Sequence, residues 1–503
     1  MKRAALCIPI AFAILVGCSR ERLNPMTERS SSVEPLGMFD RELDSDPRAQ
    51  ARAAMIRDAR RRELRFREVL EPGVSYRVTR VPQREVDDGR WSTGDLFQLG
   101  AQLFHQRFRV EDGFGGADLP RFGRFQRGHR GGPDARQCVD CHRRGGPAGA
   151  GDASDNTYIL GDGERPSTAL ERNPKSLVGL GYIELLAREM SAELAAQRSA
   201  MFNKAKSLGV EVREELTAKG VSFGALTARP DGTVDATEVA GVDVDLVVRP
   251  FGWKGRAATI REVVESELAS HHGMQSEYFA VHAPAEEKGS MPAPDPDGDG
   301  VVSEVTEGQV TALTLYAALQ EGPTVEPPTL LDEFGIPTDR YMHFWTDGVT
   351  RFREIGCASC HVPELELKSP VYSLPARETS ASLEVDLTKE GAAPRLEREP
   401  TGAVLVRAFT DLKRHDLGPF LAEPFQENGR RVSEFLTPPL WGVARSRPYL
   451  HDGRAPTLEA AILMHGGEAQ ASRDAYAELE EHERASVRVY LTSLTRARRF
   501  EVP

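Results

Sequence analysis

Two short motifs of the same form constrain this chain more than any other feature. They are Cys138-Val-Asp-Cys141-His142 and Cys357-Ala-Ser-Cys360-His361. A thioredoxin-like dithiol needs no histidine there, and a third ligand directly beside the second cysteine is poor geometry for tetrahedral zinc. Covalent haem c needs two thiols to add to its vinyl groups and a histidine placed beneath the iron. The motifs therefore predict two haem c groups rather than a disulfide, a zinc knuckle or a redox dithiol.

The N-terminus indicates an exported protein. MKRAALCIPIAFAILVGC has a basic start, an apolar run over 4–16 and a small residue before Cys18, which is typical of a signal peptide and too short to span a membrane. Residues 15–18 resemble a bacterial lipoprotein cleavage box, so we expect Cys18 to carry a lipid anchor; an ordinary signal peptide is the alternative. Ser19 favours the outer membrane. The expected location is the periplasm, lipid-anchored.

Cysteine usage and charge narrow the function classes. Of six cysteines, Cys7 and Cys18 belong to the leader, and the other four all belong to the two motifs. Acidic residues outnumber basic ones, 76 to 64, for a formal net charge of −12, and no basic stripe is present. No nucleic-acid partner is therefore expected.

The chain divides into four segments. Residues 1–18 are the lipoprotein signal peptide, and 19–90 form a polar tether with an N-terminal helix. Residues 91–322 are an expected N-terminal haem c domain, and 323–503 an expected C-terminal haem c domain. Within the first, 191–250 forms an insertion with a helix to about Ala218, then strands over 221–228 and 242–251 joined by a turn at 230–232. The predicted fold is mainly α, with long loops and this small β-containing insertion.

Segment 295–307 partly matches an EF-hand calcium loop. Acidic residues alternate before Gly300, at Asp295, Asp297 and Asp299. The twelfth position, where a bidentate glutamate is expected, is Thr306, with Glu304 and Glu307 near it. Calcium binding and an acidic turn that caps the following helix are both consistent with this pattern.

Several longer segments together resemble one family. They are QCVDCHRRGGPAGAG, RNPKSLVGLGYIELL, VVRPFGWKGRAATIREVV, REIGCASCHVPEL, KRHDLGP and TPPLWGVARSRPYLHDGRAPTLEAAILMHGGEA. The chain is similar to the di-haem cytochrome c peroxidase superfamily, and within it to the di-haem oxidoreductase branch, sometimes labelled thiol oxidoreductase. The resemblance implies two c-type haem domains packed face to face, often with calcium between them. It also implies peroxide as the substrate, and a small cytochrome or cupredoxin as electron donor.

The resemblance assigns roles to individual residues. Trp253 corresponds to a tryptophan between the haems, the alternative being an ordinary core tryptophan. His465 stands fourteen residues beyond His451, where the peroxidases place a distal methionine, and Met464 is the competing ligand. Histidine there would lower the haem potential and methionine would raise it. The positions that match the inter-domain calcium ligands are Asn173, Ser446 and Pro448.

The departures from the family concern the first haem. No histidine lies between His142 and His271, so the histidine that can cap this haem in the peroxidases is missing. His271 and His272 fall where the family keeps a distal glutamate, and Glu184 is another acid expected to face this haem. Cleaving an O–O bond needs a group that takes up and returns a proton. His271, His272 and Glu184 are therefore the predicted catalytic residues, with a surface or packing role as the alternative.

Together these observations predict a periplasmic di-haem oxidoreductase. Electrons would enter at the second haem (Cys357, Cys360, His361), cross by Trp253, and reach peroxide at the first haem (Cys138, Cys141, His142). An oxidase or oxygenase acting on an organic or protein substrate is one alternative. A plain electron carrier with both haems six-coordinate is the other.

Overall fold

The computed structural model describes residues 80–109, 135–160, 166–282, 303–322, 324–325, 338–375, 382–427 and 429–496. All of them belong to one compact unit, Ser75–Pro503. The predicted signal peptide, the tether up to residue 79, and Asp295, Asp297 and Asp299 lie outside the described residues. Among the helices that are described, none combines the length and apolar character needed to cross a membrane. The division into two haem domains at 322/323 stays a prediction.

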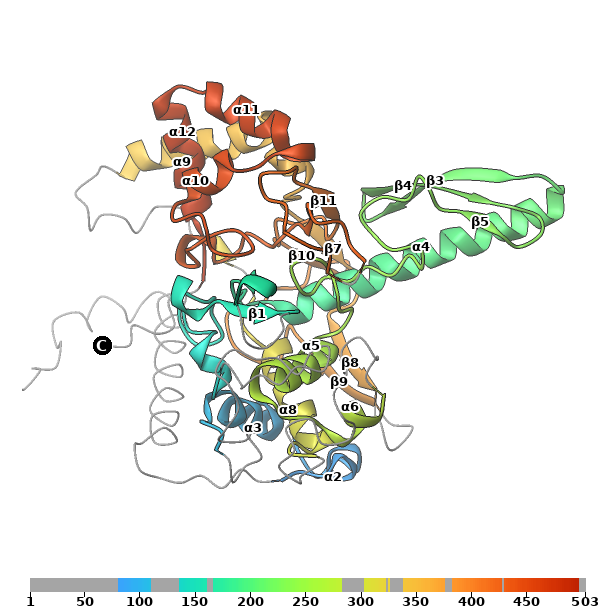
Figure 1. The fold of residues 1–503 in the computed structure, drawn as a ribbon, viewed down its shortest axis with the longest axis vertical. Helices are drawn as coiled ribbons and strands as arrows, with labels where there is room; N and C mark the ends of the chain where they lie inside the picture. Colours follow the sequence, from blue (N-terminus) through green and yellow to red (C-terminus); the bar gives the residue numbers. More distant parts are fainter. Residues whose placement is uncertain are drawn as a thin grey trace, which may run out of the picture. The chain divides into compact units, whose positions relative to one another are not determined.

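The first group of helices lies in the lower part of the view in Figure 1, and its α3 contacts the turn of the first CxxCH motif. It contains α2 (Gln83–Asp87), α3 (Thr93–His105), α5 (Ile260–Glu267), α6 (Glu277–His282) and α8 (Glu307–Ala318). Ser92 and Asp95 form a capping box that starts α3. A Cβ added at Gly100 would overlap the Ala312 carbonyl, so glycine lets α3 and α8 pack at close range.

The insertion is a long helix with a small sheet along it (Figure 1). Helix α4 (Leu180–Leu208) is followed by β3 (Val212–Ala218), β4 (Val221–Ala228) and β5 (Val234–Asp235), in the order β3-β4-β5. The helix ends because Gly209 adopts a left-handed conformation (φ 66°), and alternating burial then marks β3 as a strand. The predicted helix to Ala218 was therefore ten residues too long. The predicted strand over 242–251 was wrong, and β5 pairs with β4 instead.

The second group of helices carries the core beside the second motif. It contains α9 (Thr338–Glu354), α10 (Leu458–Leu463), α11 (Gln470–Glu478) and α12 (Glu481–Thr492). Phe352 of α9 packs against Val487, Tyr490 and Leu491 of α12 in one hydrophobic cluster. Burying such side chains contributes roughly 1.5–3 kcal/mol each. This cluster anchors the helix that leads into Cys357.

Short antiparallel ladders join the loops between the helices. They pair β1 (Thr157–Ile159) with β2 (Leu170–Arg172), β6 (Thr324–Val325) with β13 (Leu494–Thr495), β7 (Leu365–Leu367) with β10 (Val404–Val406), β8 (Val371–Pro375) with β9 (Ser382–Asp386), and β11 (Arg414–Asp416) with β12 (Glu434–Leu436). The described chain is thus a mixed fold with small sheets, and "mainly α" underestimated its strands. Loops that pack inside a protein must satisfy their backbone N–H and C=O groups, and these ladders do so.

Candidate haem sites

Each CxxCH motif lies on the wall of its own cavity. The first cavity contains Cys138, Cys141 and His142 in its wall and has a volume of about 230 Å³. The second cavity contains Cys357, Cys360 and His361 and has a volume of about 280 Å³. A 3₁₀ turn opens each motif, η3 (Cys138–Asp140) and η8 (Cys357–Ser359). In both motifs, the backbone N–H of the histidine donates to the carbonyl of the first cysteine, at 3.1 Å in the first motif and 3.0 Å in the second.

The four motif cysteines are partly buried. None of them is in a disulfide. Burial raises the pKa of the Cys138 thiol, and likewise that of Cys357, to about 12. A redox dithiol needs the opposite, a lowered thiol pKa. This environment does not favour the dithiol reading.

The two motif histidines are held in the same tautomer. His142 Nδ1 lies 3.0 Å from the Lys175 carbonyl and 3.2 Å from that of Gly149, and His361 Nδ1 lies 3.0 Å from the Phe409 carbonyl. A carbonyl only accepts, so Nδ1 carries the hydrogen and Nε2 keeps its lone pair for a metal. Burial lowers the pKa of both rings, that of His361 to about 4. Two thiols and a neutral imidazole in the wall of each cavity fit a covalently attached haem.

His465 lines the second cavity together with His361. It follows the C-terminal end of α10, whose N-terminus Thr457 caps. Its Nδ1 donates to the Ala461 carbonyl at 2.7 Å, which again leaves Nε2 as the ligating nitrogen. Met464 is half-buried and is not among the described residues that line this cavity. The placement supports His465 over Met464 as the distal ligand.

A π-helical turn brings two histidines into the first cavity. The turn η6 (Leu268–His272) follows α5, and both His271 and His272 are buried and line the cavity. His272 Nδ1 lies 2.9 Å from the Ala135 carbonyl, and its Nε2 lies 3.7 Å from Cys138 Sγ. His271 Nε2 lies 2.6 Å from a carboxylate oxygen of Glu267. Of the predicted catalytic residues, the structure therefore brings His271 and His272 together beside the first motif.

Glu267 is the residue that the sequence analysis missed. It lines the first cavity and contacts both His271 and Arg256. Burial raises the pKa of Glu267, but His271 and Arg256 outweigh it and hold this pKa below its usual range. Glu267 is therefore ionised beside the imidazole. The available signal was its position four residues before His271, which places both side chains on one face of a helix.

Glu184 does not reach either cavity. It lies on α4, fully buried, and is not among the described residues that line them. Its carboxylate pairs with Arg188 and accepts from the Ile260 N–H at 2.7 Å and the Tyr372 hydroxyl at 3.0 Å. Glu184 therefore binds the first backbone N–H of α5 and connects that helix to α4 and β8. The structure contradicts the expectation that Glu184 faces the first haem, because these contacts point it into the helix packing.

Trp253 lies in the wall that the two cavities share. The residues lining both are Asn173, Pro174, Lys175, Ser176, Leu180, Phe251 and Trp253. The Trp253 indole N–H donates to the Asn173 carbonyl at 2.9 Å, and Lys175 Nζ lies 4.9 Å from the indole centroid. Burial lowers the pKa of Lys175 to about 8. Two aromatic residues, Phe251 and Trp253, thus line both cavities, and of the two only Trp253 carries a ring N–H.

The candidate calcium ligands lie in the same region. Asn173, Ser446 and Pro448 all line the second cavity. A Cβ added at Gly453 would lie 2.9 Å from Pro448 Cγ and 3.3 Å from Asn173 Nδ2, so these two residues are neighbours. Calcium at this place stays a prediction.

The described end of the calcium-loop-like segment has structural contacts. Thr306 forms a capping box with Gln309 at the start of α8. Glu304 accepts from the Gln275 N–H at 2.6 Å, and Glu307 accepts from Arg261 at 2.9 Å. These contacts are those of a turn that caps the following helix.

The two cavities have equivalent walls, each with two cysteines and a histidine, as two haem c sites would need. Residues 393–494 match the family model described as "Di-haem oxidoreductase, putative peroxidase". The resemblance stated from the sequence is therefore confirmed over this segment, which contains His451 and His465. No curated protein matches the chain.

Three solved structures are similar at low identity. A hydrazine synthase from Kuenenia stuttgartiensis is 14% identical, with 84% of this chain and 98% of that chain covered and a TM-score of 0.33. A MauG-like protein associated with microbial copper homeostasis is 14% identical, with 86% and 97% covered and a TM-score of 0.35. The diheme peroxidase BthA from Burkholderia thailandensis is 14% identical, with 81% and 89% covered and a TM-score of 0.37. At these TM-scores none of the three assigns a fold or an activity.

Proposed function

We propose that this protein is a di-haem c-type oxidoreductase that reduces hydrogen peroxide with electrons passed from the second haem to the first. The observation that carries the proposal is Trp253, which lines both cavities. Two electrons and two protons convert one hydrogen peroxide into two waters. The electrons would come from a small reduced cytochrome or cupredoxin. Bound at its two cysteines and histidine, each haem supplies the redox chemistry, and the protein supplies ligation, proton transfer and exclusion of water.

The second cavity suits electron storage. His361 and His465 both offer Nε2, because carbonyls bind their Nδ1 atoms. If both histidines held the haem iron, no position would be left for a substrate, and the potential would be lower than with histidine and methionine. This site would pass electrons toward Trp253.

The first cavity suits proton transfer. His271 and Glu267 form a hydrogen-bonded pair beside His142, and Arg256 holds the carboxylate. A general base oriented by a carboxylate can take a proton from one peroxide oxygen and return it to the leaving one. Such a pair typically contributes a factor of about 10²–10⁴ in rate.

We also propose that the mature protein is anchored in the periplasm by a lipid on Cys18. The support is the leader sequence and the use of every other mature cysteine for haem attachment. Cys18→Ala should move the protein from the membrane to the soluble periplasmic fraction. Retention in the membrane fraction to the same extent would rule out the lipid anchor.

The activity is tested by steady-state turnover with peroxide and a reduced small cytochrome. The expected result is peroxide-dependent oxidation of the cytochrome, together with a high-spin component in the ferric spectrum from the first haem. A fully low-spin spectrum without peroxide turnover would favour the electron carrier. Oxidation of an organic or protein substrate without peroxide turnover would favour the oxidase.

A further inference from the structure

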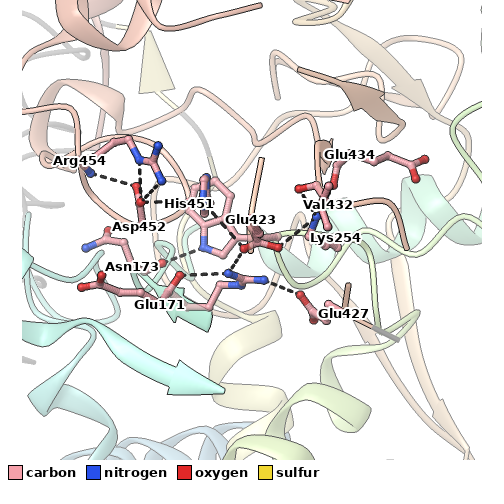
Figure 2. Close-up of polar contacts among 12 residues, drawn as sticks. Glu171, Asn173, Lys254, Glu423, Glu427, Val432, Glu434, His451, Asp452 and Arg454 are labelled. Atoms are coloured by element: carbon pink, nitrogen blue, oxygen red, sulfur yellow. Dashed lines mark hydrogen bonds and ion pairs between the residues drawn. The ribbon is translucent and has the colours of Figure 1, made fainter. Parts of the chain in front are cut away.

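Four charged residues are buried between the two cavities, and we call them the buried ion network: Arg172, Lys254, Glu423 and Glu427. Their side chains are 8%, 0%, 3% and 4% exposed. Arg172 contacts Glu423 closely and donates to Glu427 at 2.6 Å, and Lys254 Nζ lies 3.1 Å from Glu423 (Figure 2). Two cations and two anions make the network neutral.

Each of the two cations is the chain neighbour of a residue in the wall that both cavities share, either Asn173 or Trp253. Arg172 precedes Asn173, whose carbonyl accepts from the Trp253 indole, and Lys254 follows Trp253. Both anions come from the loop between β11 and β12, in the C-terminal part of the chain. The network therefore attaches the neighbours of Asn173 and Trp253 to one carboxylate, that of Glu423.

Backbone contacts complete this attachment. Lys254 Nζ also donates to the Arg431 carbonyl of the same loop at 2.8 Å. It donates as well to the carbonyls of Val432 at 3.1 Å and of Glu434, where β12 begins, at 3.0 Å (Figure 2). The Leu436 N–H donates to the Trp253 carbonyl at 2.8 Å, and the Asn173 N–H donates to the His451 carbonyl at 2.7 Å. Trp253 and Asn173 are thus fixed on their backbone as well as through their charged neighbours.

The network also reaches both cavities. Arg172 and Glu427 line the first cavity. Lys254 Nζ lies 4.1 Å from the Phe435 ring centroid, and that ring stacks on His451 at 4.4 Å; both rings line the second cavity. Removing charges from water is costly, so a buried ion network is weak evidence for stability by itself. The position of the network beside Asn173 and Trp253 points to a role other than stability.

We propose that the buried ion network is a positioning device for electron transfer between the haems. It holds Trp253 and Asn173 in the wall that both cavities share, and its neutrality sets the reduction potentials of both haems. The proposal rests on the proposed function, which routes electrons through Trp253.

The test uses the holoprotein and two single variants. Glu423→Gln keeps the shape of the side chain but leaves a net positive charge, so both midpoint potentials should rise, because a nearby cation stabilises the reduced haem. Lys254→Met leaves a net negative charge, so both potentials should fall. Each variant should slow inter-haem electron transfer after rapid reduction. Spectroelectrochemical titration and stopped-flow absorbance measure the two effects separately.

The double variant separates charge from geometry. Glu423→Gln with Lys254→Met restores neutrality but removes the attachment, so the potentials should return toward those of the wild type while transfer stays slow. Glu427→Gln, which loses one contact of Arg172, provides a milder variant should Glu423→Gln fail to fold. Glu321→Gln is the matched control, because this buried carboxylate pairs with Arg496 at 2.8 Å and neither residue lines a cavity. It should lose stability and keep the inter-haem rate.

Trp253→Phe distinguishes the two proposals. Wild-type transfer in that variant would overturn the electron route itself. Slow transfer in Trp253→Phe, with wild-type rates and potentials in Glu423→Gln and Lys254→Met, would leave the route standing and overturn the positioning role.

Discussion

Both cavities have a CxxCH motif in their wall, but the other residues that line them differ. In each, a carbonyl from a distant loop binds Nδ1 of the motif histidine, Lys175 for His142 and Phe409 for His361. The second cavity then presents His465, whose Nδ1 donates to the Ala461 carbonyl of the preceding helix α10. The first presents His271, which is bound to the carboxylate of Glu267. In the proposed function, the partner of the second histidine, rather than the shared motif, distinguishes the ligand site from the proton-transfer site.

The largest effect should come from removing one motif at a time. Cys357→Ser with Cys360→Ser should leave one covalent haem per chain and abolish peroxide turnover with a cytochrome donor, because electrons lose their entry site. Cys138→Ser with Cys141→Ser should also leave one haem and abolish turnover. A pyridine haemochrome assay counts the haems. Two haems per chain in either variant would show that these cysteines do not attach the cofactor.

The next effect concerns His271 and Glu267 in the wall of the first cavity. Glu267→Gln should lower kcat about 100-fold or more, because it removes the carboxylate that orients His271. Both haems and their potentials should be retained, since no attachment residue changes. The matched control is Glu262→Gln, an exposed capping residue of the same helix, which should stay near wild-type turnover. Equal kcat values for the two variants would show that Glu267 takes no part in the chemistry.

A smaller effect should appear at the second haem. His465→Met should raise its potential by on the order of a hundred millivolts, because the axial ligand is a main determinant of haem potential. Met464→Leu should leave the potential and the spectrum nearly unchanged. Loss of the low-spin spectrum in Met464→Leu, with His465→Ala tolerated, would reverse the assignment. Spectroelectrochemistry of the ferric and ferrous bands measures both variants.

The smallest effect is on acid stability and involves His451 in the second cavity wall. Burial, with Arg172 and nearby cations, lowers the pKa of His451 to about 3, and its Nε2 lies 3.8 Å from Glu423, beyond hydrogen-bonding distance. The unfolded chain protonates this ring near pH 6.5. The stability that neutral His451 contributes is therefore present above about pH 6.5 and lost as the pH falls toward 3, by about 1.4 kcal/mol per pH unit.

His451→Gln should remove this dependence. Between pH 7 and pH 5 the variant should lose less free energy of unfolding than the wild type, as measured by urea denaturation of the holoprotein. An identical loss in both proteins would show that His451 does not titrate on unfolding in this range. The same measurement on Glu267→Gln examines the other cavity, where the wild-type histidine, His271, has a carboxylate partner that this variant removes.

Local patterns in the sequence were sufficient for several elements. The capping residues Ser92, Thr259 and Thr306 precede apolar periodic segments, and each begins a helix there. The end of α4 was misplaced because Gly209 was not read as a helix stop, although it is the residue that adopts the left-handed conformation. Two of the short ladders, β6 with β13 and β7 with β10, escaped prediction because each pairs two or three residues from segments far apart in the chain.

The same limit applies to the candidate site. Glu184 and Glu267 are both buried or partly buried glutamates near the ends of helices, and in the sequence only the position of Glu267, four residues before His271, distinguishes them. Packing does so, because α5 places its first turn against Glu184 and its last residue, Glu267, in the first cavity.

The sequence by itself determined the two attachment motifs, the residues that would bridge and ligate the haems, and the family resemblance. The attachment motifs depend on spacing over a few residues, which bond lengths and turn geometry control directly. The bridging and distal residues were implied by the resemblance. Only the tertiary structure decided which acid partners His271, that Trp253 belongs to both cavities, and that Arg172 and Lys254 share Glu423. Contacts of this kind join residues up to hundreds of positions apart, and they exist only once the loops have packed and excluded water.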